Sequence, residues 1–216
     1  MLRGKHVKQF TLVLALLLAS CIPRDDRPEP PPRPTGSDPA ATRQCLADLA
    51  AAGVRVRALP DRTFESGCSA LGAVQLVEIG TPVANLGAMT CPLARRFAAW
   101  VRDGVQPAAR QWFGQQVTRI ESFGTYACRP VNNQAGGRLS EHGRANAVDI
   151  AAFRLADGRR ITVLGNWNGP DEKARGFLRE VHRDGCRRFA VGLGPDANAL
   201  HRDHFHFDLG RGPYCR

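Results

Sequence analysis

Cysteine placement constrains the fold of this 216-residue chain more than any other feature. None of the seven cysteines stands close enough to another to form the paired motifs of zinc knuckles or redox proteins. Six are spread through the chain after its N-terminal region, at positions 45, 68, 91, 128, 186 and 215. In an oxidising compartment such an even set predicts disulfide bridges, although the sequence leaves their pairing open.

The N-terminus predicts export into such a compartment. The basic stretch MLRGKHVKQF precedes the apolar stretch TLVLALLLAS, which is short for a membrane span and suits a signal peptide. Ala19 and Ser20 before Cys21 resemble a bacterial lipobox, in which the cysteine is lipidated after cleavage; an ordinary cleaved signal is the alternative. We therefore expect residues 1–21 to be a signal peptide with a lipobox. The mature protein would be a periplasm-facing lipoprotein of the cell envelope, anchored in the outer membrane through Cys21.

The remainder divides into a linker and one domain. Residues 22–43 are rich in proline and poor in large apolar side chains, so they read as an extended tether. Residues 44–216 are enough for one domain with its own core, and 43% of the chain is hydrophobic.

Patterning within residues 44–216 predicts a mixture of helices and strands. Helices are expected in the stretches QCLADLAAAG, CPLARRFAAWVRDGVQPAARQWF and DEKARGFLREVHRDGC, the second being broken or kinked at Gly104 and Pro107. Strands are expected in VRVRAL, GAVQLVEIG, VTRIESFG, NAVDIAAF, GRRITVLG and HFHFDLG. Because these elements do not alternate regularly as β-α-β units, the fold class is α+β: a small, mainly antiparallel sheet flanked by helices.

The net charge of +10 is almost entirely arginine. It is compatible with an anionic partner, such as a wall polymer or a membrane surface, and equally with a compositional preference for arginine. Nucleic-acid binding has no motif behind it and conflicts with export.

Four of the six histidines cluster in two stretches that also contain aspartates, EHGRANAVDI and HRDHFHFD. In the first, Asp149 shares a strand face with alanines. In the second, His204, His206 and Asp208 share one face, while Phe205 and Phe207 point to the core. Two imidazoles and a carboxylate on neighbouring strands form the ligand set of a catalytic zinc site with one open position.

These stretches resemble two known groups of proteins. The spacing Ser140-x-His142-x₆-Asp149, followed by His204-x-His206, is similar to the zinc signature of the superfamily that includes D-alanyl-D-alanine carboxypeptidases, lysostaphin-type endopeptidases and hedgehog signalling domains. The spacing His201-x-x-His204-x-His206 resembles its murein endopeptidase branch. The phrases ANLGAMTCPLA, ESFGTYACRP, SEHGRANAVDI and HRDHFHFDLG also resemble the bacterial extensin-like C-terminal domain family.

The superfamily resemblance implies a role for individual residues. Zn²⁺ would be held by His142, Asp149 and His206, and His204, with His201 and Asp203 beside it, would supply catalytic groups. The segment SFGTYACRP corresponds to a Tyr-Arg segment of the carboxypeptidases, which implies substrate binding by Tyr126 and Arg129. The chain departs from the pattern at Ala145, where glycine is usual, and at Asp203, where the carboxypeptidases have glutamate. In a regular strand Asp203 points away from His206, which favours His204 as the base.

The function expected from these residues is zinc-dependent hydrolysis of amide bonds in the stem or cross-link peptides of peptidoglycan. The rival hypothesis is a zinc-containing module that binds the cell wall without cutting it.

Overall fold

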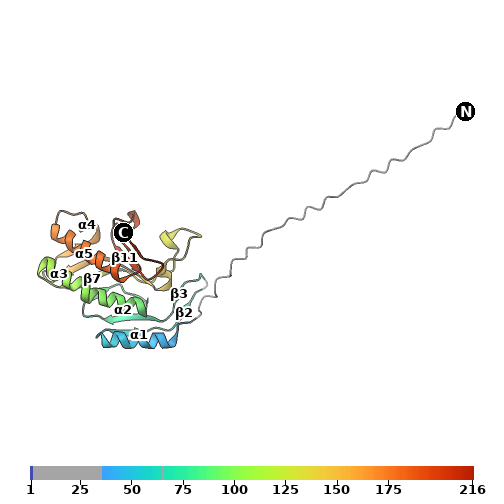
Figure 1. Ribbon diagram of the computed structural model, residues 1–216, viewed down its shortest axis with the longest axis horizontal. Coiled ribbons are helices and arrows are strands. Elements are labelled where there is room, and N and C mark those ends of the chain that lie inside the picture. The colour runs from blue at the N-terminus through green and yellow to red at the C-terminus, as the bar shows by residue number, and fades with distance from the viewer. Residues whose placement is uncertain (2–35, 65) are drawn as a thin grey trace. The chain divides into compact units, whose positions relative to one another are not determined.

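The computed structural model describes residue 1, residues 36–64 and residues 66–216 (Figure 1). The predicted signal peptide, Cys21 and most of the predicted linker therefore lie outside the described residues. The domain is α+β, as predicted. Its longer helices are α1 (Pro39–Ala51), α2 (Cys91–Trp100), α3 (Gln106–Phe113) and α5 (Glu172–Arg188), with a short α4 (Val163–Asn166). Among the described residues, no helix has the length and apolarity needed to cross a membrane.

The main sheet has seven strands and is mainly antiparallel. Its path is β12 (Tyr214–Cys215), β10 (Val191–Leu193), β11 (Phe205–Asp208), β8 (Ala147–Leu155), β7 (Val117–Gly124) and β5 (Val83–Ala84), with β9 (Arg160–Thr162) also on β8. Only the β10–β12 and β5–β7 pairs are parallel. The central strand β8 pairs with β11 through its first half and with β9 through its second. This arrangement sets β8 and β11 side by side.

A second sheet and several short elements complete the domain. Three strands form the second sheet in the order β1 (Arg55–Ala58), β4 (Ala73–Glu78) and β6 (Met89–Thr90), while β2 (Arg62–Thr63) pairs with β3 (Ser69–Ala70). Three 3₁₀ turns are η2 (Val131–Asn133), η3 (Glu141–Arg144) and η4 (Ala199–His201). Figure 1 shows α1 lying beside α2 at the edge of the domain.

The core lies where the helices pack against the sheet. Phe205 and Phe207 of β11 are fully buried there, and the Trp100 ring stands edge-on to Phe207 with centroids 5.3 Å apart. The indole N–H of Trp100 donates to the Val181 carbonyl of α5 at 3.0 Å, so its one polar atom is satisfied in the core. The two phenylalanines therefore hold β11 with one fixed face toward the helices.

Three disulfides staple the domain, as the cysteine spacing predicts. They join Cys45 to Cys91, Cys68 to Cys128, and Cys186 to Cys215. The first ties α1 to α2, and the third ties the C-terminal strand β12 to α5.

Three local expectations need correction. Helix α1 begins at Pro39, inside the predicted linker, because the Asp38 side chain accepts the Ala40 N–H and proline suits a first turn. The chain is disturbed near Gly104, as expected, but it does not break: η1 (Val101–Val105) is a π-helical turn that contains Gly104 and joins α2 to α3. The predicted strand GRRITVLG ends at Thr162, whose hydroxyl accepts the Gly165 N–H and starts α4.

Candidate metal centre

The pairing register of two strands builds the centre of the site. Asp149 of β8 stands directly opposite His206 of β11. Side chains alternate along a strand, so His206 and Asp208 project from the face opposite to Phe205 and Phe207. A hydrogen bond of 2.7 Å between His206 Nε2 and Asp208 Oδ2 is consistent with that shared face.

A short 3₁₀ turn delivers the second imidazole. The Ser140 hydroxyl accepts the His142 N–H at the start of η3, and the turn ends at Ala145. Ala145 has φ 54° and ψ 28°, in the left-handed region that glycine adopts at lower cost. The chain therefore keeps a backbone conformation suited to glycine although it carries alanine there. The Ala145 methyl is fully buried with Ala70 and Ala73, and this packing helps to offset the strain.

The side chains of three residues converge in the resulting site. His142 Nε2 lies 3.2 Å from His206 Nδ1 and 3.1 Å from Asp149 Oδ2, and His206 Nδ1 lies 2.9 Å from Asp149 Oδ1. All three residues are buried. Donors about 2.0–2.1 Å from a tetrahedral zinc ion are about 3.3 Å from one another, so these separations suit that ion. The three residues form a group that is able to hold a metal ion.

Outer hydrogen bonds orient both imidazoles toward this point. His142 Nδ1 is 3.0 Å from the Thr125 carbonyl oxygen, which only accepts, so Nδ1–H donates and Nε2 keeps its lone pair. Asp208 acts on His206 in the same way: its carboxylate accepts from Nε2–H and leaves Nδ1 facing Asp149 and His142, where it can bind a metal once its proton is released. Sequence reasoning assigned no role to Thr125 or Asp208. The signal available for Asp208 was its position two residues after His206 on the same strand face.

The pKa values of Asp149 and His206 are shifted by their contacts within the cluster. Burial alone would raise the pKa of the Asp149 carboxyl, but the His142 and His206 imidazoles beside it hold that pKa far below its ordinary value. Burial alone would lower the pKa of His206, yet its hydrogen bonds to Asp149 and Asp208 raise it to about 9. Without a metal, a proton on His206 thus balances the carboxylates; a divalent cation would take over that role.

His204, Asp203 and His201 lie beside the cluster. The His204 Nε2 atom is 3.7 Å from Asp149 Oδ1, and its Nδ1 atom is 2.9 Å from Asp203 Oδ1. Asp203 precedes β11 instead of continuing it, which is why it turns toward His204. The His201 ring centroid lies 5.2 Å from that of His204, and burial lowers the pKa of His201 to about 4, with His204 and His206 adding to the effect.

Two cavities open at the cluster, and both are lined by Arg129, His142, Asp149 and His204. One, of about 150 Å³, also has Arg138 and Arg211 on its wall. The other, of about 380 Å³, also has Phe123, Tyr126, Leu200 and Asp203. Tyr126 and Arg129, the residues expected to bind substrate, thus line cavities at the cluster. Arg138 and Arg211 carried no motif that sequence reasoning could have used.

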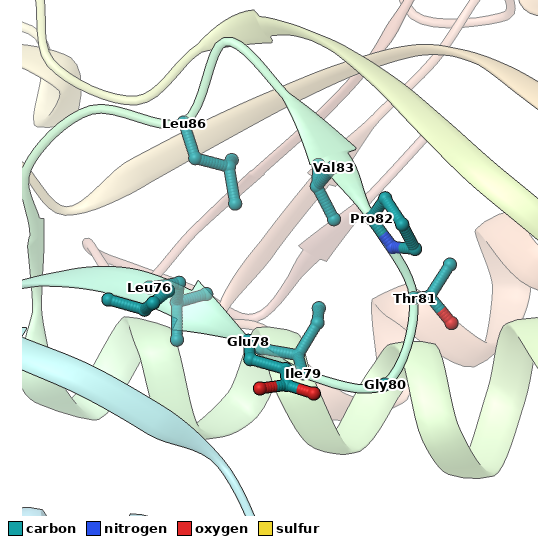
Figure 2. A pocket seen from close by; sticks show the side chains of 9 residues that line it. Leu76, Glu78, Ile79, Gly80, Thr81, Pro82, Val83 and Leu86 are labelled. Atoms are coloured by element: carbon teal, nitrogen blue, oxygen red, sulfur yellow. The ribbon is translucent and has the colours of Figure 1, made fainter.

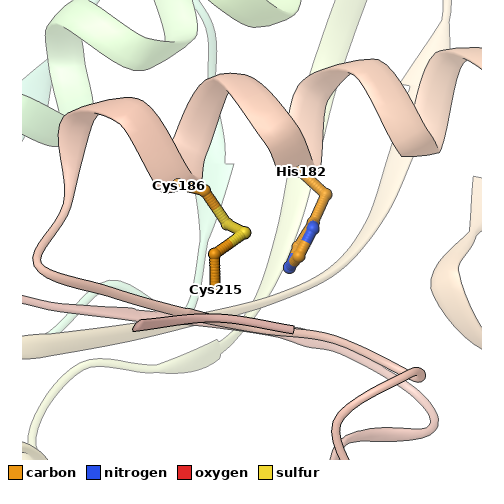
Figure 3. A group of neighbouring side chains, drawn as sticks. All are labelled: His182, Cys186 and Cys215. Atoms are coloured by element: carbon orange, nitrogen blue, oxygen red, sulfur yellow. A yellow bond between two sulfur atoms is a disulfide. The ribbon is translucent and has the colours of Figure 1, made fainter. Parts of the chain in front are cut away.

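A second group of possible metal ligands contains a disulfide bond. His182, Cys186 and Cys215 lie together between α5 and the C-terminal strand, but the two sulfurs form a disulfide (Figure 3). The buried His182 Nε2 has no hydrogen-bond partner in the described structure, and burial lowers the pKa of His182 to about 4. Oxidised sulfurs have no thiolate to offer a metal, so this group is a staple beside a neutral imidazole.

A third hollow lies away from the cluster. It is formed where β4 leads through Gly80 to β5, and its wall mixes polar groups with apolar side chains such as Ile79, Pro82 and Val83 (Figure 2). It contains no imidazole and one carboxylate, that of Glu78, so it lacks the groups for metal chemistry.

The fold and the cluster together define an α+β domain with a candidate site for a metal held by two imidazoles and a carboxylate. The chain belongs to the family described as "Extensin-like protein C-terminus", whose model matches residues 43–216. That range begins beside the predicted start of the domain. No curated protein and no solved structure matches the chain.

Proposed function

We propose that the domain is a zinc-dependent hydrolase of amide bonds in peptidoglycan stem or cross-link peptides. The observation that carries this proposal is the convergence of His142, Asp149 and His206, with one nitrogen of each imidazole held by an outer hydrogen-bond partner so that the other nitrogen faces the site. A zinc ion in such a site supplies Lewis acidity toward an amide carbonyl and toward water.

The neighbouring side chains are suited to moving protons. Asp203 accepts from His204 Nδ1–H, which leaves the Nε2 lone pair directed toward Asp149 and the cavities. His204 is therefore assigned the role of general base, and Asp203 that of a positioning residue. His201 stays neutral because of its low pKa, and its Nδ1 is held by Asn198 Oδ1 at 2.9 Å. Its ring packs against His204 and helps to fix that side chain.

The proposal extends to location and partners. The signal-like N-terminus and the lipobox at Cys21 support a lipoprotein of the outer membrane, and the three disulfides support an oxidising compartment. Wall peptides are the amide substrates within reach of such a protein.

The test uses purified protein, zinc analysis and a digest of purified muropeptides. We expect cleavage by the zinc-loaded protein and loss of both zinc and cleavage in His206→Ala. His204→Gln should keep zinc and lose cleavage, because it removes only the base. His182→Phe is the matched control, since it replaces another buried histidine outside the cluster. Intact muropeptides after incubation with zinc-loaded protein would refute the assignment as a hydrolase.

The alternative, a wall-binding module that holds zinc without cutting, is supported by the same cluster. It predicts that His204→Gln leaves the affinity for muropeptides unchanged and that no new amine is released. Measuring affinity and amine release on the same samples separates the two functions.

A further inference from the structure

The segments around Pro130 and Leu139 pair as a short hairpin, and arginines of this hairpin line the smaller cavity. Pro130 and Leu139 face each other in an antiparallel bridge. The Ser140 N–H donates to the Arg129 carbonyl at 3.1 Å, and the Val131 N–H donates to the Arg138 carbonyl at 2.8 Å. Because side chains alternate in such a ladder, the neighbours of the bridge pair project from the opposite face. That is the face that lines the cavity.

A second segment contributes another arginine to the wall of this cavity. Arg211 lies in the turn between β11 and β12 and lines the same cavity as Arg138. Among the described residues, neither guanidinium forms a salt bridge or a side-chain hydrogen bond, and the same is true of Arg129. Many other arginines of the domain are paired, for example Arg160 with Glu121 at 2.6 Å. The arginines of this cavity are therefore free to bind an anion from outside.

The carboxylates of the cavity do not neutralise these arginines. Glu141 is bound by Arg144 and by the Asn146 amide at 2.8 Å. Asp149 and Asp208 are bound to imidazoles, and a divalent cation at the cluster would balance their charge. With the metal in place, the cavity presents a net positive wall.

The larger cavity has exposed apolar side chains at its wall. Phe123 and Leu200 line it and are largely exposed, at 60% and 56% of their surface. The Phe123 ring stands edge-on to His204 with centroids 5.6 Å apart. The larger cavity thus has Phe123 and Leu200 at its wall where the smaller one has Arg138 and Arg211, and this difference gives the site a direction.

We propose that Arg138 and Arg211 form a carboxylate-binding subsite that sets the direction of the substrate across the metal centre. The carboxylate-bearing part of a wall peptide lies in the basic cavity, and an uncharged part lies over Phe123 and Leu200. This inference rests on the proposed function, because it describes how the substrate of that same site is held. Arginine suits the task, since its planar fork matches a carboxylate.

The experiment compares purified muropeptides with the same muropeptides after conversion of their carboxylates to carboxamides. Cleavage is measured as kcat/KM with the zinc-loaded protein, and affinity is measured by calorimetry in a His204→Gln background. Arg138→Gln and Arg211→Gln are each expected to weaken binding of the carboxylate form about fivefold, as for an exposed ion pair. Binding of the carboxamide form should not change. Arg110→Gln, an exposed arginine of α3 outside both cavities, controls for the loss of one positive charge.

Equal affinity of the wild-type protein for the two forms would overturn the subsite, as would an equal loss in Arg110→Gln. Cleavage without discrimination would thus retain the hydrolase and reject the subsite. A protein that binds the carboxylate form more tightly than the carboxamide form but releases no amine would retain the subsite and reject the hydrolase. Raising the salt concentration from about 0.05 M to about 0.5 M should reduce the discrimination, because exposed charges are screened over a shorter distance.

Discussion

The orientation of His206 by Asp208 leads to a prediction about metal affinity. Asp208 Oδ2 accepts from His206 Nε2–H, and Asp208 Oδ1 accepts the Gly210 N–H at 2.7 Å. In Asp208→Asn only one side-chain oxygen remains for these two donors. If it keeps the Gly210 contact, the new amide N–H₂ faces His206 Nε2 and favours the tautomer with its proton on Nδ1. That tautomer has no lone pair for the metal.

The size of the effect follows from the place of Asp208 behind the ligand. Loss of such an outer partner typically lowers metal affinity about 10- to 100-fold, or about 1.4–2.7 kcal/mol. The Asp208 side chain is only 9% exposed, so water cannot readily replace it, and the upper part of that range is expected.

The assay is a competition titration in which a chelating dye of known affinity and the protein share a limited amount of zinc. Asp157→Asn, a change of the same type in an exposed turn, is the matched control and should bind zinc like the wild type. Urea unfolding of both variants separates a loss of affinity from a loss of fold. Zinc affinity of folded Asp208→Asn within about twofold of the wild type, well below the range expected for an outer-partner loss, would refute the assigned role of Asp208.

Three further predictions concern stability, each measured by urea unfolding. His182 has a folded pKa of about 4, below its ordinary value of 6.5, so the unfolded chain binds more protons between these values. The stability contributed by neutral His182 is therefore present above pH 6.5 and lost as the pH falls toward 4. Through this residue the wild type should lose about 2 kcal/mol between pH 7 and pH 5, and His182→Phe should not show that loss. A variant as acid-sensitive as the wild type would contradict this. Replacing Cys186 and Cys215 with serine opens a loop with a sequence separation of 29 and should lower the free energy of unfolding by about 3–4 kcal/mol. A reducing agent should break this bridge in the wild type only, because the variant no longer has it. In Gly185→Ala the added Cβ would meet the Phe207 ring at 2.3 Å, so we expect a loss of about 1–3 kcal/mol; wild-type stability would mean that the ring moves freely.

Local sequence pattern was sufficient for much of the scaffold. The alternation in HFHFD separates Phe205 and Phe207 from His206 and Asp208 because side chains of a strand alternate between two faces, whatever lies next to it. The long helix α5 follows from its apolar spacing and from Asp171, which caps its first turn. The even number of cysteines after the N-terminal region indicated bridges, which the structure confirms, but not their pairing.

The sequence by itself therefore determined the candidate ligand types and the faces on which they stand, because these depend on contacts between near neighbours. Only the tertiary structure decided that Asp149 stands opposite His206, that Thr125 and Asp208 orient the imidazoles, and that Arg138 and Arg211 line one cavity. Each of these depends on strand register or loop geometry between residues far apart in the chain, which local propensity does not encode. Ala145 shows the same division. Alanine by itself favours a backbone with negative φ, whereas in the folded domain Ala145 is buried beside Ala70 and Ala73 and adopts a left-handed conformation.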